Sequence, residues 1–336
     1  MHQTENRIKF AVVGCGHIGK RHATIIENHP QCILSAFCDN KNVFVEDIFQ
    51  RTIPFFPDID TLLSSDVEID VVVIASPNGL HEQQALKALE ANKHVVIEKP
   101  MALTKAGCEK IIFKALQKQK QVFCVMQNRY SLPSQWLKDL VNTGKLGKIF
   151  MVQINCYWNR DDRYYKPNTL NTEGWHGKKD LDGGVLFTQF SHFLDLMYWC
   201  FGDITNIQAR FNNFNHQHST EFEDSGFVSF DFIDGGIGCL NYSTTVWDKN
   251  LESSITIIAE NGSIKVGGQY MDKVEYCHIK DYDLPTELNN ITAGQNHQYV
   301  IENIVDVLRG RKAITTNALE GLKVVDIIER IYSTSL

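Results

Sequence analysis

Five short apolar segments in the first part of the chain constrain the fold more than any other feature of the sequence. They are IKFAVVGCG (8–16), CILSAFCD (32–39), DVVVIAS (70–76), HVVIEK (94–99) and VFCVMQ (122–127). Continuous apolar runs of this kind are typical of strands covered on both faces of a sheet. Between them, helices are predicted up to about Asn28, over 78–92, and over 104–120 with Thr104 as N-cap. Strands that alternate with helices predict a doubly wound parallel sheet.

The alternation stops after Gly147, and strands then follow one another. A single helical segment (185–201) interrupts them, DGG (234–236) and NG (261–262) supply hairpin turns, and two late helices are predicted. The strands are predicted over 149–158, 204–211, 226–233, 236–246 and 253–268, and the late helices over 296–309 and 316–332. We therefore expect an α/β protein with an N-terminal domain (1–125) and a C-terminal α/β domain (126–336) that has a large, mostly antiparallel open sheet.

The composition of the 336-residue chain excludes several classes of protein. The net charge is −7 and no block of five like charges occurs, which argues against a nucleic-acid surface or a polybasic membrane patch. The start, MHQTENRIKF, lacks the apolar core of a signal peptide, and no apolar run approaches the roughly 18 residues of a membrane span. A cytoplasmic location is predicted. The nine cysteines include no C-x-x-C pair, so we expect no metal and mostly small buried thiols.

The sequence GCGHIG (14–19) has the spacing G-x-G-x-x-G between the first strand and the first helix. In that context the glycines allow a tight turn, the approach of a pyrophosphate and close packing of helix on strand. Asp39 follows twenty residues after Gly19, at the end of the second strand. Its carboxylate would accept hydrogen bonds from the adenosine ribose and repel a 2′-phosphate. The first domain is therefore predicted to be a Rossmann domain that prefers NAD to NADP, although Lys41 keeps this preference moderate.

Polar residues follow the next three strands at the point where each strand ends. They are Ser76-Pro77-Asn78, Glu98-Lys99-Pro100 and Gln127-Asn128-Arg129. Because ligands of open α/β sheets bind outside the carboxyl ends of the strands, these clusters describe one site. Lys99 is notable because holding a lysine in place costs up to ~2 kcal/mol of rotamer entropy.

Four motifs in this order, AVVGCGHIGKRH, ASPNGLH, EKPMALT and DGGVLFTQFSHFLD, resemble the Gfo/Idh/MocA oxidoreductases over almost the whole chain. The resemblance implies that Lys99 is catalytic at the nicotinamide, that Pro100 is often preceded by a cis peptide, and that His192 is the second catalytic group. It also implies a homodimer or homotetramer formed through the C-terminal sheet. The residues expected at the cofactor are Gly14, Gly16, His17, Ile18, Gly19, Asp39, Asn40, Ser76, Pro77, Asn78, His81, Glu98, Lys99 and Gln127.

One position departs from the family pattern. Many members carry an aspartate four residues before the catalytic histidine, where this chain has Thr188. The lysine–aspartate–histidine arrangement of inositol dehydrogenases therefore cannot be carried over. Asp195 could support His192 from behind, or it could be an exposed or interface residue.

The segments QNRYS (127–131), WNRDDRYY (158–165) and WHGKKDLDGG (175–184) resemble the branch that acts on sugars and sugar nucleotides, including UDP-N-acetylglucosaminuronate 3-dehydrogenases and sugar-nucleotide 3-ketoreductases of polysaccharide biosynthesis. An arginine suits a carboxylate or phosphate, and aromatic rings suit a sugar face. Alternatively, this aromatic-rich region packs over the domain interface. The residues expected at the substrate are Asn128, Arg129, Arg160, Tyr164, Tyr165, Trp175, Thr188, Gln189 and His192.

The expected reaction is reversible hydride transfer between a secondary alcohol carbon of a sugar, C3 of a UDP-linked amino sugar or uronate, and NAD. Apolar surroundings disfavour the ammonium form of Lys99, so that its neutral amine could accept the alcohol proton. His192 would bond the same hydroxyl or relay the proton. Three alternatives stay open: a dehydrogenase of a free sugar or inositol, a non-catalytic NAD-binding sensor, and a glycosidase that uses NAD transiently.

Overall fold

The computed structural model describes residues 7–41, 52–165, 174–289 and 296–334, which belong to two compact units. The first unit takes in Met1–Met126 and His297–Val325, and the second takes in Gln127–Asn296 and Asp326–Leu336. The segment His297–Val325, which sequence position alone assigned to the C-terminal domain, therefore groups with the first unit. Each unit contains one sheet, and the predicted α/β class is confirmed.

The sheet of the first unit has six parallel strands in the order β3-β2-β1-β4-β5-β6. This order, with its reversal between β1 and β4, is that of dinucleotide-binding folds. The strands are β1 (Ile8–Val13), β2 (Cys32–Cys38), β3 (Phe55–Phe56), β4 (Val71–Ile74), β5 (His94–Ile97) and β6 (Val122–Cys124). The five strands predicted from apolar runs are present. Strand β3 was not predicted, because two residues are too few to form a pattern.

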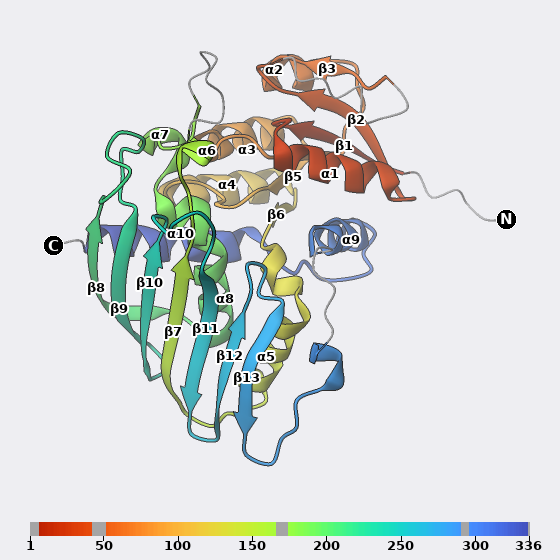
Figure 1. Cartoon of the computed structure of the whole chain (residues 1–336). Helices are drawn as coiled ribbons and strands as arrows, with labels where there is room; N and C mark the ends of the chain where they lie inside the picture. Colours follow the sequence, from red (N-terminus) through yellow and green to blue (C-terminus); the bar gives the residue numbers. More distant parts are fainter. Residues whose placement is uncertain (1–6, 42–51, 166–173, 290–295, 335–336) are drawn as a thin grey trace. The chain divides into compact units, whose positions relative to one another are not determined.

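Helices lie around this sheet (Figure 1). Side chains of its central strands are completely buried. This burial explains why those strands read as unbroken apolar runs rather than alternating ones. The helices are α1 (His17–Asn28), α2 (Ile59–Leu63), η2 (Asn78–Leu80), α3 (His81–Glu90), α4 (Lys105–Lys118) and α9 (Asn296–Leu308). Thr104 caps α4 as predicted, because its hydroxyl accepts a hydrogen bond from Gly107 N at 3.0 Å.

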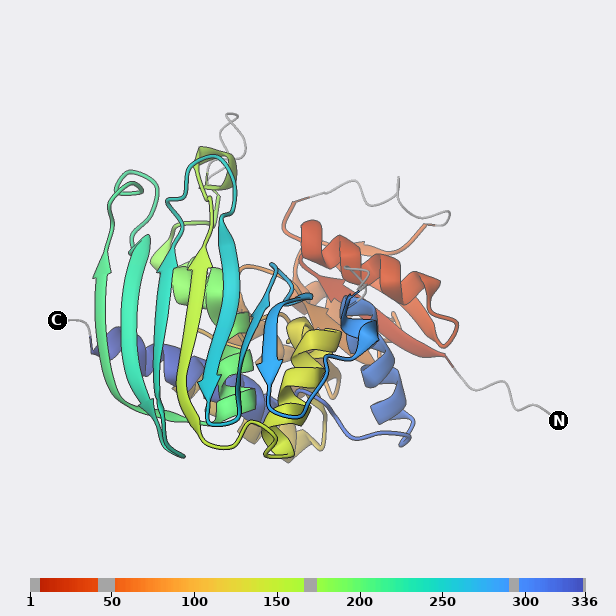
Figure 2. The ribbon, with the colours of Figure 1, turned by 60° about the horizontal axis from the view of Figure 1, so that its bottom comes forward.

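The sheet of the second unit has seven strands in the order β13-β12-β11-β7-β10-β9-β8 (Figure 2). All neighbours are antiparallel except β7 and β10, which are parallel. The strands are β7 (Ile149–Tyr157), β8 (Ile204–Asn212), β9 (Ser225–Phe232), β10 (Ile237–Ser243), β11 (Glu252–Ala259), β12 (Gly262–Gly267) and β13 (Lys273–Ile279). The mostly antiparallel sheet was predicted. Its edge strand β13 was not, because most of its side chains are exposed and the apolar signal is weak.

Helices α5 and α8 lie on one face of this sheet (Figure 2), where Phe193 of α8 packs against Trp158 at a ring separation of 6.1 Å. The predicted helix 185–201 is present, but its first turns form a π-helix, η4, that continues into α8. The remaining elements are η3 (Gln127–Tyr130), α5 (Leu132–Asn142), α6 (Asp162–Tyr165), α7 (Lys179–Asp182), η4 (Leu186–Phe190), α8 (Ser191–Phe201) and η5 (Thr286–Asn289). Helix α10 (Ala318–Ser333) begins in the first unit and ends in the second.

The structure also shows the state of the cysteines and the character of the helices. All nine cysteines are free thiols and seven of them are buried, as expected for small core residues. Within the described ranges, no helix is long and apolar enough to cross a membrane.

Candidate active site

The glycine loop after β1 leaves the start of helix α1 open. Gly14 has φ +91°, and a Cβ there would lie 2.5 Å from the backbone of Ala75. A Cβ on Gly19 would lie 1.8 Å from the Gly14 carbonyl oxygen, so helix and loop touch. Gly16, in contrast, faces open space, and no side chain caps the first turn of α1. An uncapped helix start beside open space fits the pyrophosphate of a dinucleotide.

Asp39 lies at the end of β2 and is tied to the glycine loop. Its Oδ2 accepts a hydrogen bond from Cys15 N at 2.7 Å, and its Oδ1 accepts one from Lys41 N at 3.0 Å. Each carboxylate oxygen has a second lone pair, so the half-buried Asp39 can still accept from ribose hydroxyls. Its charge beside the loop disfavours a 2′-phosphate.

His81 joins the ends of strands β4 and β5. The ring is completely buried, with Nδ1 2.7 Å from the Pro100 carbonyl oxygen and Nε2 2.9 Å from the Ser76 carbonyl oxygen. Burial lowers the pKa of His81, which favours the neutral ring. Both ring nitrogens of His81, a residue expected at the cofactor, thus face backbone carbonyl oxygens at these strand ends. The Lys99–Pro100 peptide is cis, as the resemblance implied.

Glu98 is buried in a cluster with two histidines of the first unit. Its Oε1 lies 2.7 Å from His22 Nε2, and the His22 ring meets the His297 ring edge-on at 5.7 Å. Burial alone would raise the pKa of Glu98, but the hydrogen bond and charge of His22, with smaller effects of His297 and Lys99, lower it to about 2. Glu98 is therefore ionised next to Lys99. His297 was not anticipated, since no local pattern links α9 to β5.

In the second unit, His192 is held by a buried hydrogen bond. Gln127 Nε2 and His192 Nε2 lie 2.9 Å apart, and both side chains are buried. An amide nitrogen can only donate, so in this arrangement His192 Nε2 is the acceptor. The structure thus brings together Gln127, expected at the cofactor, and His192, expected in catalysis.

Arg129 and Asp195 form a buried ion pair behind His192. Arg129 Nε and Nη2 donate to Asp195 Oδ2 and Oδ1 at 2.8 and 2.6 Å, and the guanidinium lies 5.2 Å from the Trp199 ring. Asp195 is completely buried, which overturns the alternative of an exposed residue. Arg129, expected at the substrate, thus joins η3 to α8 through Asp195.

Arg160, on the segment after β7, is held between aromatic rings. Its guanidinium carbon lies 4.7 Å from the Trp158 ring and 5.1 Å from the Tyr164 ring. Its Nε donates to Gln189 Oε1 at 2.7 Å, and Gln189 Nε2 donates to the Tyr164 hydroxyl at 2.7 Å. Burial lowers the pKa of Arg160, yet guanidinium stays charged at neutral pH. Among the described residues, no carboxylate forms an ion pair with Arg160.

The aromatic residues expected at the substrate gather in one cluster around Arg160. The Tyr164 ring lies 5.1 Å from Tyr165 and 4.3 Å from His176, and the His176 ring lies 3.9 Å from Trp175. His216 completes the cluster at 5.2 Å from Tyr165. These rings can offer apolar faces to a sugar. The described part of the chain thus brings Arg160, Tyr164, Tyr165, Trp175 and Gln189 together.

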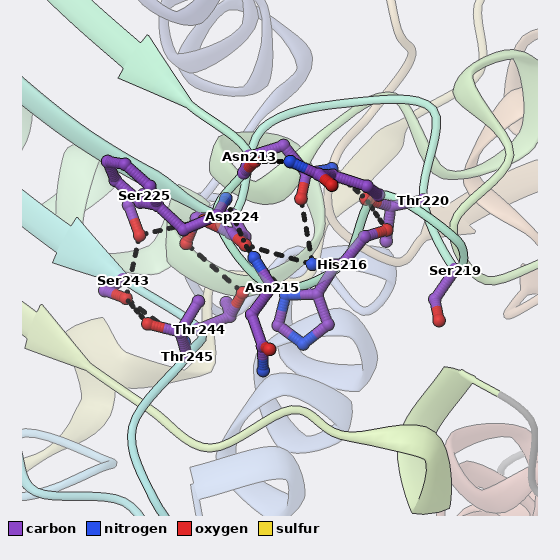
Figure 3. Close-up of polar contacts among 12 residues, drawn as sticks. Asn213, Asn215, His216, Ser219, Thr220, Asp224, Ser225, Ser243, Thr244 and Thr245 are labelled. Atoms are coloured by element: carbon purple, nitrogen blue, oxygen red, sulfur yellow. Dashed lines mark hydrogen bonds and ion pairs between the residues drawn. The ribbon is translucent and has the colours of Figure 1, made fainter.

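A buried carboxylate holds His216 in this cluster (Figure 3). Asp224 Oδ2 lies 3.2 Å from His216 Nδ1 and accepts hydrogen bonds from Phe214 N and Asn215 N at 2.9 and 2.7 Å. Burial acts to raise the pKa of Asp224, but these hydrogen bonds outweigh it and keep the pKa below its usual value. His216 and Asp224 were not predicted from the sequence, because a polar loop between strands carries no periodic signal.

Thr188, which replaces the familiar aspartate, is bonded to another carboxylate. Its hydroxyl makes a short hydrogen bond to Asp182 Oδ1 and lies 2.9 Å from the Asp182 carbonyl oxygen. Asp182 is buried, and its Oδ2 accepts from Gly177 N at 2.8 Å. A carboxylate is therefore present next to residue 188 after all, supplied by Asp182 of the sequence DGG at 182–184.

Comparisons with known proteins agree with this architecture. The family model for the oxidoreductase family with an NAD-binding Rossmann fold matches residues 8–126, and that for the GFO/IDH/MocA C-terminal domain matches residues 134–265. Within the described residues, no group of three or more potential metal ligands is found.

Two similar solved structures are WlbA dehydrogenases in complex with NADH and UDP-GlcNAcA. The protein from Chromobacterium violaceum is 30% identical with a TM-score of 0.88, over 99% of this chain and 94% of that one. The protein from Bordetella pertussis is 29% identical with a TM-score of 0.87, over 98% and 97%. Among curated relatives, D-glucoside 3-dehydrogenase of Escherichia coli K12 is 24% identical over 99% of this chain and 96% of its own length.

Replacing Asp39 by Asn should weaken the preference for NAD. The amide keeps an oxygen for the Cys15 N–H but loses the charge that repels a 2′-phosphate. We expect the ratio of NADPH to NADH affinity, measured by titration calorimetry, to rise about tenfold, or ~1.4 kcal/mol. Asp70→Asn is the matched control, because Asp70 also accepts a backbone N–H, from Lys9, but precedes β4. An unchanged ratio would contradict the role of Asp39.

The cofactor predicted from the glycine loop and Asp39 is confirmed as NAD, since the first unit matches an NAD-binding domain and similar structures hold NADH. The 30% identity to a WlbA dehydrogenase over 99% of the chain, together with the two matching domains, leaves one conclusion. This chain belongs to the Gfo/Idh/MocA family of NAD-dependent oxidoreductases.

Proposed function

We propose that this protein is an NAD-dependent 3-dehydrogenase, reversible as a 3-ketoreductase, of a UDP-linked N-acetylamino uronate such as UDP-N-acetylglucosaminuronate. The observation that carries the proposal is the guanidinium of Arg160. It is part-buried, fixed by Gln189 and two rings, and unmatched by any carboxylate of the described residues. A buried charge is costly unless paired. A substrate carboxylate or phosphate supplies the missing partner through charge-assisted hydrogen bonds.

The nearby rings support a sugar as the rest of the ligand. Tyr164 lies beside Arg160 and Trp175 belongs to the same ring cluster, both half-buried, while the buried Tyr165 packs against Tyr164. The similarity to two dehydrogenases crystallised with UDP-GlcNAcA points the same way. A free neutral sugar or inositol would leave Arg160 without a counter-charge, so this alternative is second.

When bound, NAD supplies the acceptor for the hydride, and the chain's own residues handle the proton and the orientation. In this proposal Lys99 faces the reacting hydroxyl. As the ammonium, Lys99 can stabilise an alkoxide or protonate it during ketone reduction, and as the neutral amine it can accept the hydroxyl proton.

His192 is proposed as the second catalytic group. Its Nε2 is held by Gln127 Nε2 at 2.9 Å, and it can receive a hydroxyl proton when the substrate hydroxyl takes the place of that amide. On the same helical segment, the Thr188 hydroxyl holds the carboxylate of Asp182, which belongs to α7. Arg160 and the aromatic cluster would orient the sugar, which is the other large contribution available to the protein.

The direct test is to add NAD and a panel of substrates and to follow the absorbance of reduced nicotinamide. We expect UDP-N-acetylglucosaminuronate to be oxidised, UDP-N-acetylglucosamine to react poorly, and free sugars and inositol to react least. Preferred oxidation of a free sugar would favour the second candidate. Absence of net NAD reduction with every compound would contradict the proposal and favour the transient-NAD or sensor alternatives.

Replacing Arg160 by Gln should raise KM for the uronate substrate by about 10–100-fold, because a charge-assisted pair contributes about 1.5–3 kcal/mol. The effect on UDP-N-acetylglucosamine should be smaller if the arginine binds the carboxylate. Arg163→Gln is the matched control, because Arg163 is exposed and already paired with Asp161. Steady-state kinetics give both values. Equal, small effects of the two variants would remove Arg160 from the site.

Replacing Lys99 by Met or His192 by Asn should reduce kcat by about 10³-fold, within the range for loss of general acid–base catalysis. NADH affinity, measured by fluorescence quenching, should change less than about threefold for both variants if the residues act in chemistry rather than in binding. A variant that retains turnover would exclude its residue from the mechanism.

We also propose that two or more copies of the chain associate through the open face of the second unit's sheet. Strand pairing aligns Ile237 with Met151 and Met151 with Ile258, and these three side chains are 51%, 41% and 41% exposed. An exposed apolar row across three strands fits the same row of a second copy.

Replacing Ile237 by Glu should break this contact and lower the mass measured by light scattering. Leu116→Glu is the control, because Leu116 is 73% exposed on α4 of the first unit. A monomeric wild type, or an unchanged mass for Ile237→Glu, would contradict the proposed interface.

A further inference from the structure

The helical segment that carries Thr188, Gln189 and His192 starts without a cap of its own. Its first backbone bond runs from Thr188 N to the Gly184 carbonyl oxygen at 3.1 Å. The amides of Val185, Leu186 and Phe187 precede that bond and have no partner within the helix. No side chain at the start of the segment caps them.

Tyr332 and Glu223, which come from distant parts of the chain, lie at the start of this segment. Leu186 N donates to the Tyr332 hydroxyl at 3.1 Å, and that hydroxyl donates to Glu223 Oε1 at 2.6 Å. The Val185 amide also acts on the Glu223 carboxyl and contributes to lowering its pKa. Tyr242 fixes the same carboxyl, because its hydroxyl donates to Oε1 at 2.9 Å.

Gly184, the second glycine of the sequence DGG at 182–184, makes this arrangement possible. Gly184 has φ +129°, a region that favours glycine. A Cβ at this position would lie 2.5 Å from the Tyr332 hydroxyl oxygen. Glycine therefore permits both the turn before the helix and the approach of Tyr332 from α10.

We propose that Glu223 and Tyr332 are positioning residues that cap the helix bearing His192 and thereby fix the placement of His192 and Gln189. Neither residue touches the reacting atoms. A carboxyl group at a helix N-terminus satisfies unpaired amides and complements the helix dipole. The π-helical start of the segment has shifted backbone bonds, so an external cap is needed to hold one geometry. The catalytic part of this inference rests on the proposed role of His192.

The ionisation of Glu223 allows the cap to be tested independently, through the dependence of stability on pH. Burial raises its pKa from 4.5 to about 7, despite hydrogen bonds from Tyr332 and Tyr242 that lower it. The ionisable groups that face it are those two tyrosines and Tyr165, with Asp182 and Asp224 acting on the tyrosines. Because the folded-state pKa is raised, the folded form binds the proton more tightly. This contribution to stability is present below pH 4.5 and is lost as the pH rises through about 7.

The test compares Tyr332→Phe and Glu223→Gln with wild type by amide hydrogen exchange and by kinetics. In Tyr332→Phe we expect exchange of the Leu186 amide to accelerate at least about tenfold, since it loses its acceptor. With UDP-N-acetylglucosaminuronate, kcat should fall about tenfold while KM changes less than twofold. Tyr282→Phe is the matched control, because it removes a hydroxyl bonded to Trp136 instead.

Glu223→Gln keeps a hydrogen-bond acceptor but cannot ionise. It should show a smaller increase in exchange at Val185 and Leu186. Its melting temperature should also fall less than that of wild type between pH 4.5 and 7. This variant keeps the test decisive if Tyr332→Phe does not fold.

Unchanged exchange at Leu186 in Tyr332→Phe, or unchanged exchange at both amides in Glu223→Gln, would overturn the cap. Faster exchange with unaltered kcat would overturn the positioning role. Faster exchange in an enzyme whose wild type does not oxidise the substrate would refute the proposed function alone and leave the cap supported.

Discussion

The buried ion pair between Arg129 and Asp195 is the constraint on which the site of the second unit depends. It joins η3 to α8 by two parallel hydrogen bonds, and its charges are almost completely removed from water. Such a pair is weak evidence for net stability, but losing one partner leaves an uncompensated buried charge that costs about 3–5 kcal/mol. The pair therefore fixes register more than it adds stability. Gln127 and His192 lie on the same two elements, so their 2.9 Å contact depends on that register.

The distribution of charge explains why Arg160 stands out. Three buried carboxylates are engaged by partners inside their own unit: Glu98 by His22, Asp195 by Arg129, and Asp182 by Thr188 and Gly177. Asp224 is likewise occupied by His216 and backbone amides. Arg160 has only neutral partners among the described residues. These buried carboxylates thus have partners within the protein, whereas Arg160 has no carboxylate partner among the described residues. An anionic ligand could supply the missing partner of Arg160.

The sequence predicted what depends on local pattern. Apolar runs predicted the strands, the glycine spacing predicted the open start of α1, and Thr104 predicted the start of α4. Contacts between distant segments were not predictable, because no periodicity links Glu98 to His297 or Glu223 to Tyr332. Arg129 was placed at the substrate because it follows a strand end among polar residues. Position along the chain does not encode side-chain direction, and its fork points to Asp195 instead.

The sequence DGG at 182–184 shows how the site accommodates a threonine instead of an aspartate at position 188. A threonine at 188 cannot carry charge, but its hydroxyl can donate a hydrogen bond to Asp182, whose carboxylate is ready six residues earlier. Gly184 of the same motif admits the Tyr332 hydroxyl to the start of the helix. One short segment thus supplies a carboxylate to Thr188 and access for the cap. The Asp182 carboxylate reaches residue 188 through a hydrogen bond from the threonine hydroxyl. Its charge therefore lies one hydrogen bond further from the helix than the charge of an aspartate at position 188 would. A weaker field at that position would suit the anionic substrate that we propose for Arg160.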